Sequence, residues 1–286
     1  MVAEIFSTLK KNKIFNPEAS SSVEDRKIIL GETTNIIQLN RIKYQWAYEL
    51  YKTMSFSNFW IPEEINMIQD KKDYNTILSE KEKWSFELVL SFLIALDSYQ
   101  VNMLKEFARY FTSPELILAI TAQEFQEGLH SYSYQYILES IADPVKTKEV
   151  YEMWREDNTL FERNKVIAEI YDNFIESPNL ENFLKAIVAN YILEGIYFYS
   201  GFAFFYSLGR MGKMRATVQQ IKYINRDELT HVSLFRNIIL TVLEELKKEV
   251  NVEKVKDWIY ENFKFAVDKE VNWGKYIIGN HINGLT

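Results

Sequence analysis

Two of the three histidines in this chain stand in the same short motif. Glu127 and His130 form an E-x-x-H sequence, and Glu228 and His231 form a second one. On a helix, residues three positions apart lie about one turn apart on the same face, so each carboxylate and imidazole can bind one metal ion together. A single E-x-x-H is weak evidence, because Glu is common on helix surfaces. Its repetition makes metal binding the first hypothesis.

Each motif is preceded by an acidic residue in an otherwise apolar segment. Asp97 ends the run Phe-Leu-Ile-Ala-Leu-Asp, 30 residues before Glu127, and Glu194 follows Tyr-Ile-Leu, 34 residues before Glu228. A buried carboxylate without a partner costs roughly several kcal/mol, so such residues need a hydrogen-bonded partner or a metal. The chain therefore contains an approximate internal duplication, in which each half supplies a carboxylate and then an E-x-x-H motif.

Four packed helices carrying these six residues would bring four carboxylates and two imidazoles to the centre of one bundle. This is the ligand set of ferritin-like proteins that hold two iron or two manganese ions, and oxygen ligands mixed with imidazole suit both metals. Glu124 competes with Glu127, because it lies three residues earlier on the same face. We favour Glu127, since the E-x-x-H spacing occurs identically in both halves.

Tyr134 follows His130 by four residues, about one helical turn, and is therefore expected near the metals. A tyrosine in that position can act as a one-electron reductant for oxidising metal ions. With 18 Tyr in the chain, the position alone equally fits an ordinary aromatic residue of the core.

The segments that must position these residues have the pattern of long helices. Apolar residues recur at three- and four-residue spacing, and no proline interrupts a long periodic stretch. Ser79 and Glu82 form a capping box that opens one helix. We predict an all-α bundle of long helices over residues 36–286, preceded by a polar arm over residues 1–35. The expected helical segments are approximately 37–54, 79–111, 113–141, 144–176 (more than one helix), 179–208, 213–250 and 252–279.

The composition excludes several classes of function. The 286 residues include no cysteine, which excludes disulfides, zinc–thiolate sites, thiol nucleophiles and iron–sulfur clusters. A formal charge of −7 without a basic stripe argues against binding nucleic acid or an anionic membrane. Apolar runs are broken within about a dozen residues and the N-terminus lacks a signal-peptide pattern, so we expect no membrane span and a cytoplasmic location.

Several stretches resemble the small, radical-generating subunit of class I ribonucleotide reductase. They follow the family's order over roughly residues 35–285, and the F-W-I-P-E-E stretch at 59–64 and R-D-E-L-T-H at 226–231 separate this family from others with the same ligand pattern. The resemblance implies one metal ion held by the first set of ligands and a second ion held by the other set, with bridging carboxylates. These sets are Asp97, Glu127 and His130, and Glu194, Glu228 and His231.

The resemblance also implies roles for residues around the metals. Tyr134 would be the radical tyrosine, in a dry pocket. Asp227 would hydrogen-bond the ligand His130, and Trp60 would pair with Asp227, which gives a path for electrons from Trp60 to the metal. The apolar pocket would be formed by Phe198, Phe202 and Ile224.

The implied function is that of the small subunit of ribonucleoside-diphosphate reductase. Two iron ions, or manganese in their place, would activate O2 and form a stable radical on Tyr134, and a separate large subunit would use it to make deoxyribonucleotides for DNA synthesis. The missing cysteines fit this role, because the thiols that reduction requires would belong to the large subunit. The resemblance further implies a homodimer, for which Trp46, Tyr48 and Tyr51 are candidate interface residues.

The match departs from the family at its end. Members normally continue beyond the point equivalent to residues 283–286 with a helix and a tail that docks on the large subunit, so we expect weak binding of the partner by the chain as given. His281 has no counterpart in the motif and is expected at the surface or at a helix end. Two alternatives are a related oxidase that acts on a bound ligand, and a bundle that stores metal without redox chemistry. Tyr134, Trp60 and Asp227 together argue against the first, and the second leaves Tyr134 and Trp60 unexplained.

Overall fold

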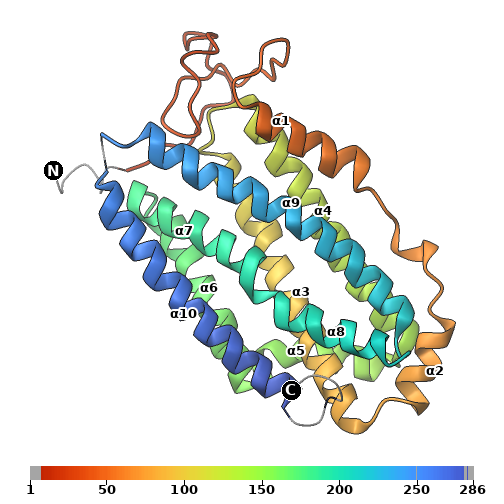
Figure 1. Cartoon of the computed structure of the whole chain (residues 1–286). Coiled ribbons are helices and arrows are strands. Elements are labelled where there is room, and N and C mark those ends of the chain that lie inside the picture. Colours follow the sequence, from red (N-terminus) through yellow and green to blue (C-terminus); the bar gives the residue numbers. More distant parts are fainter. Residues whose placement is uncertain (1–7, 249, 280–281, 283–286) are drawn as a thin grey trace.

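Long helices form most of the computed structural model, which describes residues 8–248, 250–279 and 282 (Figure 1). Ser79 accepts a hydrogen bond from the backbone N–H of Glu82 and the Glu82 carboxylate accepts one from Ser79, so the predicted capping box is present. The α-helices up to residue 176 are α1 (Gln45–Lys52), α2 (Ile68–Thr76), α3 (Glu80–Ala108), α4 (Pro114–Ile141), α5 (Pro144–Glu156) and α6 (Asn158–Glu176).

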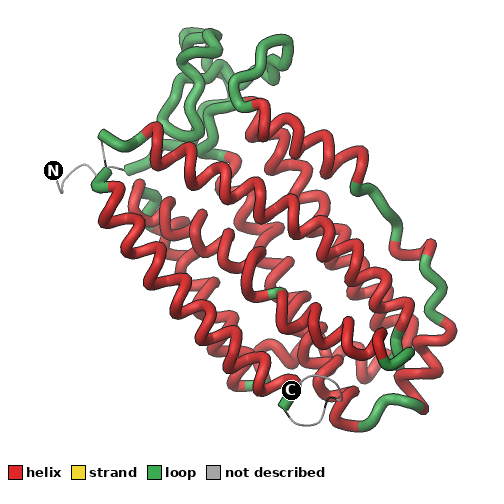
Figure 2. Tube along the Cα trace, viewed as in Figure 1, coloured by secondary structure: helices red, strands yellow, loops and turns green. Residues whose placement is uncertain are grey.

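The second half continues the bundle. Its helices are α7 (Leu180–Ile192), α8 (Tyr199–Arg210), α9 (Arg215–Glu245) and α10 (Val252–Ile278). Figure 1 shows α3, α4, α7 and α9 running through the centre, and contacts join α3 to α4, α4 to α9 and α7 to α9. The prediction of an all-α bundle is confirmed, and among the described residues no segment forms a strand beyond two isolated bridges (Figure 2). No described helix is long and apolar enough to cross a membrane.

One predicted long helix is interrupted. Instead of a continuous helix over 179–208, α7 passes into a π-helical turn, η3 (Leu193–Tyr197), before α8 begins. A second π turn, η1 (Thr53–Ser57), extends α1, and a short 3-10 turn, η2 (Pro62–Glu64), follows it. A π turn inserts one residue into the helical repeat, and in η3 that turn carries Glu194.

The first helix begins at Gln45 rather than near Ile37 as predicted. Residues 8–44 form no helix and lie across one end of the bundle (Figure 2). The backbone carbonyls of Gln38 and Arg41 accept hydrogen bonds from the guanidinium of Arg26, and the carboxylate of Glu115 accepts one from the backbone N–H of Lys43. These tertiary hydrogen bonds take the place of the backbone hydrogen bonds of a helix, so the segment up to Tyr44 stays non-helical.

Candidate metal centre

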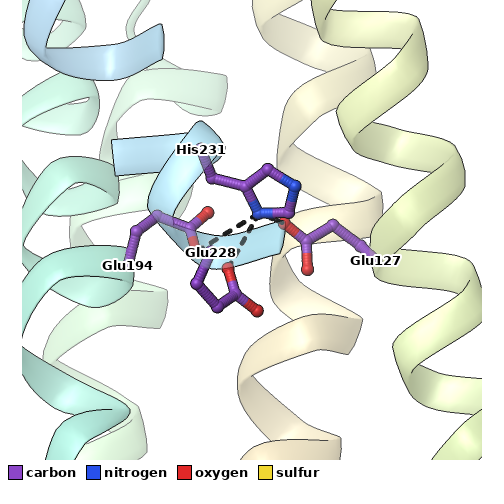
Figure 3. A group of neighbouring side chains, drawn as sticks. All are labelled: Glu127, Glu194, Glu228 and His231. Carbon is purple, nitrogen blue, oxygen red and sulfur yellow. Dashed lines mark hydrogen bonds and ion pairs between the residues drawn. The ribbon is translucent and has the colours of Figure 1, made fainter. Parts of the chain in front are cut away.

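Six side chains predicted to bind metal converge between the central helices. Asp97 comes from α3, Glu127 and His130 from α4, Glu194 from η3, and Glu228 and His231 from α9, and all six are fully buried. Figure 3 shows four of them pointing toward one another, and potential ligand atoms of these four lie within 4.8 Å of each other. A second group with the same spacing consists of Asp97, Glu127 and His130.

The two histidines turn the same ring nitrogen toward the carboxylates. Nδ1 of His231 lies 2.8 Å from Glu228 and 3.1 Å from Glu127. Nδ1 of His130 lies 3.2 Å from Glu228 and 3.5 Å from Glu127. Each of these glutamates therefore reaches both imidazoles, which is the placement expected of carboxylates that bridge two ions. Asp97 lies 3.8 Å from Nδ1 of His130, and Glu194 lies 3.8 Å from Nδ1 of His231.

Trp60 and Asp227 lie behind His130. Nε1 of Trp60 donates to Asp227 Oδ2 at 2.9 Å, and the same oxygen lies 3.4 Å from Nε2 of His130. Arg226 donates to the other oxygen of Asp227 at 3.0 Å. The structure thus brings together the three residues that the sequence resemblance connected. Their roles stay proposals.

Glu194 sits in a cage of amides that sequence reasoning missed. Its Oε1 accepts hydrogen bonds from Gln100, from Gln123 at 2.8 Å and from Asn190 at 3.4 Å. Tyr171 in turn donates toward Gln100 and Asn190. One signal was available, because Asn190 precedes Glu194 by four residues, the spacing at which helical side chains meet.

The electrostatics show that Asp97 and Glu194 are poorly placed to carry a negative charge without a cation nearby. Burial, with the charge of Glu127 next, raises the pKa of Asp97 well above its usual value. Burial and the charges of Glu127 and Glu228 do the same to the pKa of Glu194. Burial alone would lower the pKa of His130, but the neighbouring carboxylates of Asp227, Glu127 and Glu228 raise it. Crowded acids therefore retain protons that a bound cation would displace.

Several ligand atoms at the centre have no hydrogen-bond partner. They include both carboxylate oxygens of Asp97, one oxygen each of Glu127, Glu194 and Glu228, and Nδ1 of His130. Buried polar atoms are almost always hydrogen-bonded, so this cluster of exceptions requires an explanation. Hard oxygen donors mixed with imidazole nitrogen fit a pair of iron or manganese ions.

Tyr134 lies on α4, fully buried, and its hydroxyl also lacks a hydrogen-bond partner. Burial, followed by the charge of Asp97, raises the pKa of this phenol well above its usual value. The proposed pocket residues are buried as well, and the rings of Phe198 and Phe202 stack at 5.6 Å. The third of them, Ile224, is fully buried on α9.

Two other sequence candidates lie elsewhere. Glu124 is partly exposed and pairs with Lys105 at 3.6 Å, and it belongs to neither cluster of potential ligands found among the described residues. The geometry therefore favours Glu127, as we expected from the repeated spacing. His281 lies outside the described residues.

The central helices and the six converging side chains define a helical bundle whose carboxylates and histidines suit two metal ions. Residues 36–286 match the family described as "Ribonucleotide reductase, small chain". The chain belongs to this family, so the resemblance of its sequence to that small subunit is confirmed.

Relatives with the name ribonucleoside-diphosphate reductase subunit beta are similar to this chain. The protein of Treponema pallidum (strain Nichols) is 43% identical over 99% of this chain and 80% of its own length. The protein of Aquifex aeolicus (strain VF5) is 66% identical over 78% of this chain, but the match spans only 32% of that protein.

Solved structures give the same result. The chain is similar to the ribonucleotide reductase R2 subunit from Clostridium botulinum, with a TM-score of 0.94 and 45% identity over 98% of this chain and 87% of that one. An R2-like ligand-binding oxidase with a Mn/Fe cofactor has a TM-score of 0.63 at 20% identity over 82% of this chain and 83% of that one, which is a likeness of fold alone.

Proposed function

We propose that this chain is the radical-generating small subunit of a class I ribonucleoside-diphosphate reductase. The observation that carries the proposal is the buried cluster of six metal-binding side chains, with Tyr134 one helical turn beyond His130. Membership of the small-chain family supports it. The chain would need a large subunit for turnover, because it contains no cysteine to supply the thiols that reduce the nucleotide.

Six side chains would hold a pair of iron ions, or manganese in their place. Asp97, Glu127 and His130 would hold one ion, and Glu194, Glu228 and His231 the other. When bound, the metal pair would activate O2 and supply the oxidising power. The two glutamates that reach both imidazoles, Glu127 and Glu228, would bridge the ions.

The protein's own contribution at Tyr134 is to keep a neutral phenol dry and poised to lose an electron. Burial holds its proton in place at ordinary pH. Oxidation of a phenol to a neutral radical releases that proton, and the charge of Asp97 acts on this hydroxyl more strongly than that of any other residue. We assign Asp97 as the proton acceptor once it has lost the proton that it retains without metal. The buried rings of Phe198 and Phe202, with Ile224, would keep water and reductants away.

Trp60, Asp227 and His130 would connect the site with the exterior. The indole donates to the Asp227 carboxylate, which also lies within reach of the His130 ring. The carboxylate would orient the imidazole and stabilise its positive character. Trp60, at 4% exposure, would deliver an electron during activation and later carry the radical toward the large subunit. A second copy of the chain would complete a homodimer.

The test is an electron paramagnetic resonance spectrum of metal-free protein after addition of Fe(II) and O2. We expect a tyrosyl signal, and we expect the Tyr134→Phe variant to bind the same amount of metal without that signal. Tyr110 offers a matched control, because it too is a buried tyrosine but packs against Phe174, and Tyr110→Phe should keep the signal.

Metal content separates the other outcomes. Two ions per chain without a radical would move the proposal to a manganese cofactor, to be tested by loading Mn(II) with a suitable oxidant. Oxidation of a bound organic ligand, with Tyr134→Phe fully active, would favour an oxidase that acts on a ligand. A chain that takes up no metal would contradict the whole proposal.

A further inference from the structure

The residue that immediately precedes the glutamate of each E-x-x-H motif reaches the histidine of the other motif. Asp227 precedes Glu228, and its Oδ2 lies 3.4 Å from Nε2 of His130. Gln126 precedes Glu127, and its Oε1 lies 2.9 Å from Nε2 of His231. The internal duplication therefore extends by one position, from E-x-x-H to a five-residue unit whose first side chain crosses to the opposite helix.

The orientation of the Gln126 amide is fixed from its other end. The side chain is 1% exposed, and its Nε2 donates to the backbone carbonyl of Met54, in the π turn η1, at 3.3 Å. The amide nitrogen is thereby directed away from the cluster, and only the oxygen faces His231. An amide oxygen can only accept, so Nε2 of His231 must carry the proton.

That proton decides which nitrogen of His231 is free to bind metal. With hydrogen on Nε2, the lone pair of the neutral ring is on Nδ1, which faces Glu228 at 2.8 Å and Glu127 at 3.1 Å. Ligand histidines in metalloproteins usually donate their second N–H to an oxygen acceptor, which fixes both ring orientation and tautomer.

We propose that Gln126 is the positioning residue of His231, as the neutral counterpart of Asp227 at His130. This inference rests on the proposed function, since it assumes that the cluster holds two ions. It adds that the two ions differ in how strongly their ligand histidines are supported. A carboxylate partner makes an imidazole a stronger metal ligand than an amide partner does. The ion at Glu194, Glu228 and His231 therefore depends on a histidine whose hydrogen-bond partner is weaker and uncharged.

Metal binding tests this without any assay of activity. The affinity for Mn(II) is measured anaerobically by equilibrium dialysis, and electron paramagnetic resonance reports whether the ions are a coupled pair or isolated. In Gln126→Met, which keeps the volume but loses the acceptor, we expect one of the two affinities to fall 10–100-fold. At a concentration that fills both positions in the unsubstituted chain, this variant should show isolated Mn(II).

Three further variants make the result specific. Gln126→Asn keeps an amide but is one methylene too short to reach, so it should lose affinity as Gln126→Met does. Gln126→Glu keeps the acceptor and should bind both ions at least as tightly as the unsubstituted chain. Gln220→Met is the matched control, because Gln220 is equally buried but bonds Ser133 and Met67 instead of a ligand histidine. It should leave both affinities unchanged.

The outcomes separate this inference from the proposed function. If the unsubstituted chain binds a coupled pair and so do Gln126→Met and Gln126→Asn, with unchanged affinity, Gln126 does not position His231 and the inference is wrong. Equal losses in Gln126→Met and Gln220→Met would also overturn it, since a general packing defect would then explain them. If the unsubstituted chain binds no Mn(II) or Fe(II), the proposed function itself fails.

Discussion

Single side chains at the centre of this protein lower its stability in the absence of metal. Asp97 is fully buried, neither of its carboxylate oxygens has a hydrogen-bond partner, and its neighbours are other acids. Such an arrangement costs folding free energy. Sites of this kind are retained for function, at the expense of the fold that carries them.

Replacing Asp97 by Asn should therefore stabilise the metal-free protein. The amide has nearly the same shape but is neutral without taking up a proton, whereas the raised pKa of Asp97 costs folding free energy at neutral pH. We expect the free energy of unfolding of the metal-free variant to rise by about 1–3 kcal/mol. Urea unfolding in the presence of a chelator measures this. With Mn(II) added, the unsubstituted chain should be the more stable of the two proteins, because it gains binding energy that the variant lacks. A less stable metal-free variant would contradict the argument.

The six converging side chains could be predicted from the sequence, but the residues that support them could not. Repetition of E-x-x-H and of an upstream acid is a pattern within each half, and it indicated all six residues that converge. Gln126 crosses to the other motif, so only the packing of α4 against α9 reveals its contact with His231. Gln100 acts in the same way on Glu194 from a different helix.

Among the helices, the π turn that carries Glu194 is held by a buried ion pair. Arg163 of α6 donates to the carboxylate of Glu270 of α10 and to the backbone carbonyl of Tyr197 at the end of η3. The carboxylate of Glu270 also accepts from the backbone N–H of Ser200 at 2.8 Å. The pair thus satisfies backbone groups where the π turn passes into α8.

Removing one partner of this ion pair should lower the stability of the protein more than removing both partners. In Glu270→Gln the guanidinium of Arg163, which is 8% exposed, would lose its charged partner, and we expect a loss of about 3–5 kcal/mol of stability. The double variant Arg163→Met with Glu270→Met should be less destabilised than the sum of Arg163→Met and Glu270→Met. Chemical unfolding of the four proteins forms the cycle, and strict additivity would show that the pair is not coupled.

The long helices could be predicted from apolar periodicity, but their irregularities could not. A π turn adds a single residue, which shifts the apolar pattern too little to show within one turn, so the interruption at η3 was missed. The start of α1 was placed too early for another reason. Residues 37–44 have helical periodicity, but Arg26 and Glu115 draw their backbone groups into tertiary hydrogen bonds.

Over the whole molecule, one buried carboxylate fastens the non-helical residues 8–44 to the bundle. Glu115, in the first turn of α4, accepts hydrogen bonds from Arg26 at 2.7 Å, from the backbone of Lys43 at 2.8 Å and from Ser113. Burial alone would raise the pKa of Glu115, but the hydrogen bonds of Ser113 and Lys43 and the charge of Arg26 lower it below its usual value.

This attachment should weaken in acid. Because the pKa of Glu115 is lower in the folded than in the unfolded protein, its contribution to stability is complete above about pH 4.3 and is lost as pH falls through the folded value. At pH 7 we expect Glu115→Gln to cost about 2–3 kcal/mol. The difference from the unsubstituted chain, measured by urea unfolding, should shrink toward pH 3. A difference that does not change with pH would contradict this assignment.

The crossing of Gln126 and Asp227 between the two motifs affects how natural variants of this chain should be interpreted. Substitution of Gln126 would weaken binding of the ion at Glu194 and His231, although Gln126 stands beside Glu127 in the sequence. Substitution of Asp227 would weaken binding of the ion at Asp97 and His130. Proximity in sequence would assign each defect to the wrong ion. If each motif supports the histidine of the other, the two motifs form one functional unit, and a defect in either is expected to affect both ions.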